Sequence, residues 1–93
     1  MVYLQIFLDI SPDKRPEAAA IYNKYKSAFL EKISGALSKN LLIRDEDVQV
    51  LHWFDTVENA NAYLSSSLFN QDVVSELKPL LNSSPDVRIY TAV

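Results

Sequence analysis

The chain has 93 residues, a net charge of −3, one histidine and no cysteine. This length predicts a single domain over residues 1–93, and an acidic balance without a basic stripe argues against a nucleic-acid-binding protein. The lack of cysteine excludes disulfides and gives no support to secretion. The apolar N-terminus has no basic leader and is too short to span a bilayer, so we expect a cytoplasmic protein that does not interact with membranes.

Residues 2–10 have the period of a β-strand. Every second residue is aliphatic, and the opposite face is mixed but still largely apolar: Tyr3, Gln5, Phe7 and Asp9. A strand with one solvated face would alternate more cleanly. The pattern therefore predicts that both faces of this strand are covered.

From Pro16 to Ile33 the apolar period changes to that of a helix, and Gly35 follows where a left-handed C-terminal cap is wanted. Tyr22 and Tyr25 lie on the apolar side of this helix. Packing against a sheet is the simpler role for both tyrosines. The alternative is that a tyrosine hydroxyl lines a pocket.

Residues 37–43 form a weaker strand, and its polar residues are typical of a sheet edge. Residues 44–47 form a polar turn. Its acidic side chains are too closely clustered for a calcium loop and the turn has no glycine, so we expect no metal site. A third strand, residues 48–54, alternates clearly and contains His52.

A broken helical region follows, and a last strand closes the chain. Asp55 and Glu58 resemble a capping box at the start of the first helical piece. Asn70 is the predicted cap of a second piece, which Pro79 ends or kinks. After a turn cluster, residues 87–93 read as a strand.

The order strand, helix, strand, strand, helix, strand predicts an α+β fold. We expect a ferredoxin-like βαββαβ domain of two layers, an antiparallel sheet with the helices on one face. The expected strand order across the sheet is last, first, third, second.

The junction from Trp53 to Ala60, with Tyr63 and Leu64 after it, resembles the strand-to-helix junction of the dimeric α+β barrel superfamily. That superfamily includes antibiotic-biosynthesis monooxygenase-like proteins, stress-responsive barrel proteins and haem-degrading monooxygenases. The resemblance covers the whole chain in length and element order. It implies that two copies pair into a homodimeric barrel. It does not choose among the activities of the superfamily, which include cofactor-free oxygenases, isomerases and cyclases.

The haem-degrading members use an asparagine on the first strand and a histidine on the second helix. Here the first strand has Gln5, and residues 56–81 contain no histidine. Haem degradation is therefore not expected. No histidine pair, cysteine or spaced carboxylate cluster is present either, so we expect no metal and no cofactor.

His52 is the candidate catalytic residue, because its unperturbed pKa alone suits acid–base chemistry near neutral pH. If the aliphatic faces mark the helix side of the sheet, His52 lies beneath the helices, where burial should lower its pKa and keep it neutral. The alternative is a half-buried structural imidazole. The candidate ligand-binding residues around it are Gln5, Tyr22, Asn23, Tyr25 and Tyr63.

Two functions remain open from the sequence. One is a cofactor-free monooxygenase, isomerase or cyclase that acts on a small apolar or aromatic molecule with His52 as base. The other is a non-catalytic ligand-binding or interaction module in which His52 is structural. For either function we expect a two-fold homodimer, because one sheet face has surplus apolar surface. Its predicted interface residues are Tyr3, Phe7, Leu51, Trp53 and Tyr90.

Overall fold

The computed structural model describes residues 1–93 and has the predicted element order. The strands are β1 (Val2–Leu8), β2 (Ala36–Ile43), β3 (Val48–Phe54) and β4 (Asp86–Thr91). The long helix α1 is Arg15–Lys32, preceded by the short turn η1 (Pro12–Lys14). The second helical region consists of α2 (Val57–Leu64), η2 (Leu68–Val73), α3 (Val74–Leu77) and η3 (Lys78–Leu80).

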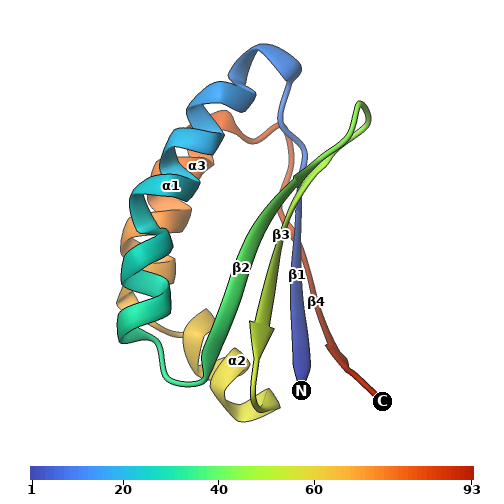
Figure 1. The fold of residues 1–93 in the computed structure, drawn as a ribbon. Coiled ribbons are helices and arrows are strands. Elements are labelled where there is room, and N and C mark those ends of the chain that lie inside the picture. The colour runs from blue at the N-terminus through green and yellow to red at the C-terminus, as the bar shows by residue number, and fades with distance from the viewer.

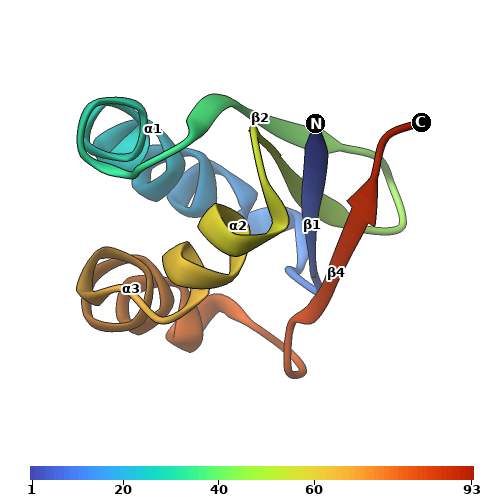
Figure 2. The ribbon, with the colours of Figure 1, turned by 90° about the horizontal axis from the view of Figure 1, so that it is seen from below.

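The four strands form one antiparallel sheet in the order β2-β3-β1-β4, which confirms the predicted order. All helices lie on one side of this sheet, with α1 and α3 side by side (Figures 1 and 2). No element of the chain covers the other side. The ferredoxin-like two-layer architecture is therefore confirmed.

The core lies between the sheet and the helices. Every second residue of β1 and β3 is buried, and in β1 these residues are all aliphatic, as the sequence pattern predicts. Phe29 of α1 packs edge-to-face on Phe54 and on Tyr63, with ring centroids 5.6 and 5.0 Å apart. These aromatic contacts tie both helical regions to the centre of the sheet.

Gly35 has φ +76°, the left-handed conformation predicted for it. It is not the helix cap, however, because α1 ends at Lys32 with Ile33 as its C-cap, and Gly35 turns the chain into β2. A Cβ here would lie 2.1 Å from Asp55 Oδ1, so a larger residue would have to displace the Asp55 side chain and would also strain the backbone. Gly35 O also accepts a hydrogen bond from Asp55 N at 3.0 Å. The glycine thus sets how closely the start of β2 approaches the end of β3.

The second helical region differs from its sequence prediction at both caps. Thr56, not Asp55, is the N-cap of α2, and its hydroxyl accepts a hydrogen bond from Asn59 N at 3.2 Å. Asp55 instead accepts from the Asn59 side chain. The next piece begins after Ser67 rather than at Asn70, and Leu68–Val73 is π-helical. The Ser66 hydroxyl accepts a hydrogen bond from Phe69 N at 3.2 Å, which supports a helix start before Asn70.

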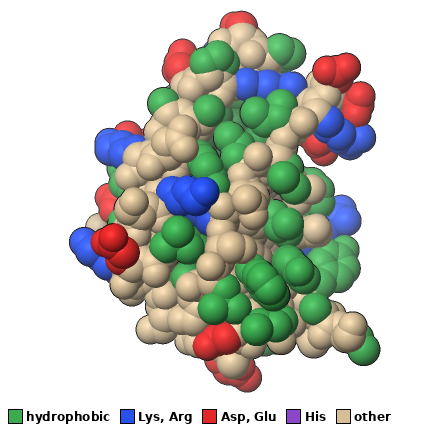
Figure 3. Space-filling view, viewed as in Figure 1, with side chains coloured by type: hydrophobic (Ala, Val, Ile, Leu, Met, Phe, Trp, Pro, Cys, Tyr) green, Lys and Arg blue, Asp and Glu red, His purple; other side chains and the backbone are tan.

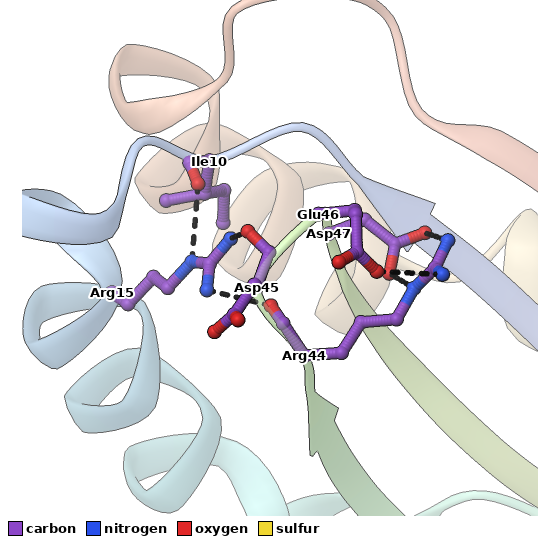
Figure 4. A network of polar contacts seen from close by, with 6 residues as sticks. All are labelled: Ile10, Arg15, Arg44, Asp45, Glu46 and Asp47. Carbon is purple, nitrogen blue, oxygen red and sulfur yellow. Dashed lines mark hydrogen bonds and ion pairs between the residues drawn. The ribbon is translucent and has the colours of Figure 1, made fainter.

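The β2–β3 turn is held by charged side chains (Figure 4). Arg15 of α1 donates to the carbonyl oxygens of Ile10, Arg44 and Asp45 at 3.2, 2.7 and 3.0 Å. Arg44 pairs with Asp47 at 2.6 Å. Arg15 therefore anchors the start of α1 to the turn. The structure contains no group of three or more His, Cys, Asp or Glu side chains that could hold a metal ion. No helix is both long and apolar enough to cross a membrane.

Candidate functional site

An apolar cavity lies between the sheet and the second helical region. Its volume is about 30 Å³, and a smaller cavity of about 20 Å³ adjoins it. Lys39 is the only charged residue in the lining of either cavity, and both are otherwise almost entirely apolar. Together they have room for a few water molecules. The polar groups of the larger cavity are His52, Lys39 and Tyr63.

His52 lies on the helix side of β3, as predicted, and is 2% exposed. Its Nδ1 lies 3.0 Å from the carbonyl oxygen of Leu4, which can only accept, so Nδ1 carries the proton and Nε2 is left as an acceptor. Burial lowers the pKa of His52 to about 3, the Leu4 hydrogen bond acts in the opposite direction, and the charge of Lys39 lowers it further. The imidazole is therefore neutral at any physiological pH.

Lys39 is a buried residue that sequence analysis did not identify as a site residue. It lies opposite His52 in the β2–β3 register and is 3% exposed. Its Nζ lies 5.1 Å from the centre of the Phe29 ring and 5.6 Å from that of Tyr22. Burial lowers the pKa of Lys39 to about 8, with a further contribution from the positive charge of Lys26. Lys39 is thus the group in the cavity whose pKa is closest to neutral pH.

A shift in register places Lys39 inside. Ala36 lies opposite Phe54, but Ser38 lies opposite Trp53, so one extra residue of β2 is accommodated as in a β-bulge. In an unbroken register Lys39 would face outward, because side chains alternate between the faces. The apolar pattern of β2 carries a weak signal of this shift, since the bulge turns Leu41 inward along with Lys39. The polar residues of β2 were interpreted as those of a sheet edge, so the inward orientation of Lys39 was not predicted.

Two of the predicted ligand-binding residues are brought to the cavities. Tyr63 of α2 lines the larger one; its hydroxyl is buried without a partner, and burial raises its pKa. Tyr22 of α1 lines the smaller one and donates to the Lys39 carbonyl oxygen at 2.5 Å. Tyr22 therefore holds β2 against α1, whereas the Tyr63 hydroxyl is free to bind another group.

The contrast between the two hydroxyls can be measured. Tyr63→Phe should leave the free energy of unfolding unchanged or raise it by about 1 kcal/mol, because it removes an unpaired buried polar group. Tyr22→Phe is the matched control and should cost about 1 kcal/mol, because it breaks a hydrogen bond. Urea unfolding of both variants tests this. A larger loss for Tyr63→Phe than for Tyr22→Phe would show that the Tyr63 hydroxyl is paired.

The other three predicted ligand-binding residues lie outside the cavities. Gln5 points to the uncovered face of the sheet, because it alternates with the inward-facing residues of β1. Asn23 is exposed on α1. The Tyr25 hydroxyl donates to the carboxylate of Glu76, which also pairs with Lys24, so Tyr25 joins α1 to α3. We therefore do not retain these three as ligands of the cavity.

The helical wall of the larger cavity is irregular. Phe69 and Val73 of the π-helical η2 line it, followed by Val74 and Leu77 of α3. Helices of the π type are rare and occur frequently at functional sites. The segment Leu68–Leu80 contains three helix types within thirteen residues, π, α and 3₁₀ in that order.

The uncovered face of the sheet carries the predicted interface residues. Tyr3 stacks on Trp53 with ring centroids 5.9 Å apart, and Tyr90 is 50% exposed. Two polar atoms on this face, Trp53 Nε1 and Gln49 Oε1, are buried without a hydrogen-bond partner. In the view of Figure 3, hydrophobic side chains gather over the sheet and charged ones at the β2–β3 turn. The face is mixed: Tyr3, Phe7, Leu51 and Trp53 lie beside polar residues, among them Gln5, Gln49 and Arg88. Two of its polar atoms have no hydrogen-bond partner within the chain.

Comparisons with known proteins establish the fold. No family model and no curated protein matches the sequence. Solved structures do match, among them three provisionally named as antibiotic biosynthesis monooxygenases. The protein from Nitrosomonas europaea has a TM-score of 0.83 at 10% identity, with 100% of this chain and 99% of that chain covered. The protein from Caulobacter crescentus has a TM-score of 0.84 at 15% identity, with 99% and 89% covered. The protein from Bordetella bronchiseptica has a TM-score of 0.83 at 15% identity, with 99% and 97% covered.

These structures span almost the whole of both chains, so this chain has the fold of the solved proteins that are named as antibiotic biosynthesis monooxygenases. This confirms the resemblance predicted from the Trp53–Ala60 junction. At such low identity the likeness extends to the fold and not to residue roles.

Proposed function

We propose that this protein is a small-molecule enzyme of the cofactor-free monooxygenase kind, with its substrate bound in the cavity beneath the helices. The observation that carries the proposal is the pair His52 and Lys39, buried side by side in an otherwise apolar cavity. Active sites use burial and neighbouring charges to shift pKa values, so buried titratable groups with shifted pKa values in a cavity mark a candidate site. The names of the structural neighbours point in the same direction.

The chemistry that this site supports is the oxidation of a phenol to a quinone by molecular oxygen. Nε2 of His52 accepts the phenol proton, and the electron-rich anion reacts with O₂ at a ring carbon. A carbon–oxygen bond forms, the oxygen–oxygen bond breaks, and one oxygen atom stays on the ring as a carbonyl. The other leaves as water with the two hydrogens that the substrate loses. The phenol supplies all four electrons, so no further reductant is required.

The substrate needs more room than the cavities now offer. Ligand pockets usually measure about 300–1,000 Å³, against about 30 Å³ here. Movement of Leu68–Leu80 away from the sheet would join the two cavities, which already share Leu8, Lys39, Val50, Val73 and Leu77 as walls. Lid segments of this kind open on microsecond to millisecond timescales.

Oxygen uptake tests the proposed function. The purified protein, with metal chelator present, should consume O₂ with a small phenol and form one quinone per O₂. Boiled protein and the variant His52→Gln are the controls. Absence of uptake across a panel of mono- and dihydroxylated arenes, at protein concentrations where the chain is folded, would contradict the proposal.

A second function is favoured by one observation. His52 Nδ1 is already bonded to Leu4 and its ring packs on Phe29 and Tyr63, which a purely structural imidazole also requires. A ligand-binding module without catalysis would share the cavity but consume no oxygen. The oxygen measurement therefore separates the two functions.

We further propose that the protein is a two-fold homodimer paired through the uncovered face of the sheet. Trp53→Ala should destabilise this pairing by about 3–5 kcal/mol, the usual range for truncating a buried aromatic residue. Light scattering at micromolar concentration should then show a dimer for the wild type and a monomer for Trp53→Ala. Leu30→Ala, an exposed apolar position on the helix layer, is the control and should remain dimeric. A compact wild-type monomer would contradict this prediction.

A further inference from the structure

We propose that the natural ligand of the cavity carries a negative charge on an apolar body, and that the ammonium group of Lys39 is its counter-ion. This inference rests on the cavity of the proposed function and adds the charge of the substrate. The ligand is an aryl anion, either a phenolate or an aryl carboxylate. Its charged group lies beside Lys39 and its ring lies among the apolar residues of the cavity wall.

The first argument is that no carboxylate of the chain pairs with the ammonium group of Lys39. The ion pairs of the structure all lie elsewhere, between Lys24 and Glu76, within Arg44–Asp47, and between Asp86 and Arg88. The groups that face Lys39 are the neutral imidazole of His52 on β3, the rings of Tyr22 and Phe29 on α1, and the like charge of Lys26. A buried charge without a partner is costly. An anionic ligand would supply the partner.

The second argument is that the backbone directs Lys39 into this position. The register shift between Ala36 and Ser38 turns the lysine inward, although its long side chain could reach solvent from an edge strand on the other face. Bulges are over-represented beside active sites, where they re-aim a side chain. The inward lysine is therefore a property of the fold of β2 and not of one flexible rotamer.

The third argument is that the cavity lined by Lys39 also contains hydrogen-bonding atoms of Tyr63 and His52 that are not engaged by the chain. The Tyr63 hydroxyl is buried without a partner and can donate to an anion. His52 Nε2 can accept from a hydroxyl of the ligand, because Nδ1 holds the ring proton. One cation, one donor and one acceptor in an apolar setting suit a hydroxylated aryl monoanion. A dianion would leave a second charge unpaired.

The test uses 4-nitrophenol, whose phenolate is yellow and whose phenol form is colourless, and the neutral probe 4-nitroanisole. Binding next to Lys39 should lower the apparent pKa of 4-nitrophenol by about one unit or more, because an opposite charge favours the ionised form. Lys39→Met should abolish this shift and weaken binding of the phenolate at least tenfold, while 4-nitroanisole still binds. Lys32→Met, an exposed position at the end of α1, removes the same charge and should behave as the wild type.

A second measurement does not depend on a variant. In NMR spectra of lysine-labelled wild-type protein, addition of benzoate should raise the pKa of Lys39, and addition of benzamide should not, since linkage between the two charges is reciprocal. Stronger competition by benzoate than by an unsubstituted phenolate for the same site would identify a carboxylate ligand. The reverse order would identify a phenolate.

The inference is overturned if binding does not lower the apparent pKa of 4-nitrophenol, or if that pKa is still lowered in Lys39→Met. It is also overturned if the wild type binds neither 4-nitrophenol nor 4-nitroanisole. Its failure is distinguishable from failure of the proposed function. If the pKa of bound 4-nitrophenol is lowered but no oxygen is consumed, the protein is an anion-binding module, and only the proposed enzymatic function is contradicted. Oxygen uptake without a lowered pKa contradicts only the role of Lys39.

Discussion

Replacing Lys39 with methionine is expected to stabilise the ligand-free protein at pH 7 by on the order of 2–3 kcal/mol. Burial lowers the pKa of Lys39 from 10.5 to about 8, and each pKa unit corresponds to about 1.4 kcal/mol. Methionine has a similar length and carries no charge, so it fills the same space without that cost. The midpoint of thermal unfolding should rise by roughly 10 °C or more.

The pH dependence identifies the cause. Because the pKa of Lys39 is lower in the folded state, the unfolded chain binds more protons between about pH 8 and 10.5. Wild-type stability therefore gains a contribution from Lys39 as pH rises through this window. The advantage of Lys39→Met should be full below about pH 8 and disappear above about pH 10.5. Urea unfolding at pH 7, 9 and 10.5 measures it, with Lys32→Met as the control for net charge.

A loss of stability in Lys39→Met at pH 7 would contradict this account. It would mean that the ammonium is compensated within the folded chain, through the Tyr22 and Phe29 rings or through bound water. In that case Lys39 would be a structural residue, and its burial would no longer favour a ligand.

Replacing His52 with glutamine is expected to reduce turnover of a phenolic substrate by roughly a hundredfold to ten-thousandfold. Glutamine keeps a comparable size and can donate to Leu4 O, but it cannot take up a proton as imidazole does. The fold and the dimer should be unaffected, because His52 lies on the helix side of the sheet. Oxygen uptake and light scattering on the same preparation measure the two effects.

The pH profile separates the roles of the two residues. The pKa of His52 is about 3, so the imidazole stays deprotonated and its contribution should be constant from about pH 5 upward. Lys39, whose pKa is about 8, is faced by His52, Tyr22, Phe29 and Lys26, and Tyr63 lines the same cavity. When Lys39 loses its charge at alkaline pH, activity should fall. The Lys39→Met variant should not show this fall of activity at alkaline pH. The sequence alone favours a neutral-to-alkaline optimum for a histidine base, and Lys39 limits its alkaline side.

Full activity of His52→Gln would remove His52 from the mechanism. The remaining base in the cavity would then be neutral Lys39, whose pKa is about 8, so activity would have to rise through pH 8 instead of falling. If activity depended neither on His52 nor on pH near 8, acid–base chemistry at this cavity would be excluded and the binding module would be favoured.

The alternation of apolar residues in β1 and β3 was sufficient to determine much of the structure. Period two in Val2–Leu8 and Val48–Phe54 defines which residues face the helices, and this places His52 inside without further information. Gly35 likewise marks the end of the first helical unit, because no other residue adopts its backbone conformation readily. These are local or strictly periodic properties, and a sequence carries them directly.

Lys39 shows what only the tertiary structure could decide. Its orientation depends on one extra residue near Leu37, and a bulge depends on pairing with β3 rather than on any local pattern. The same holds for Gln5, Asn23 and Tyr25, whose residue types suit a site but whose positions relative to the cavity depend on how distant elements pack. Residue type and periodicity are properties of the chain, whereas convergence on a cavity arises from contacts between segments far apart in sequence, such as Leu4, Lys39 and His52.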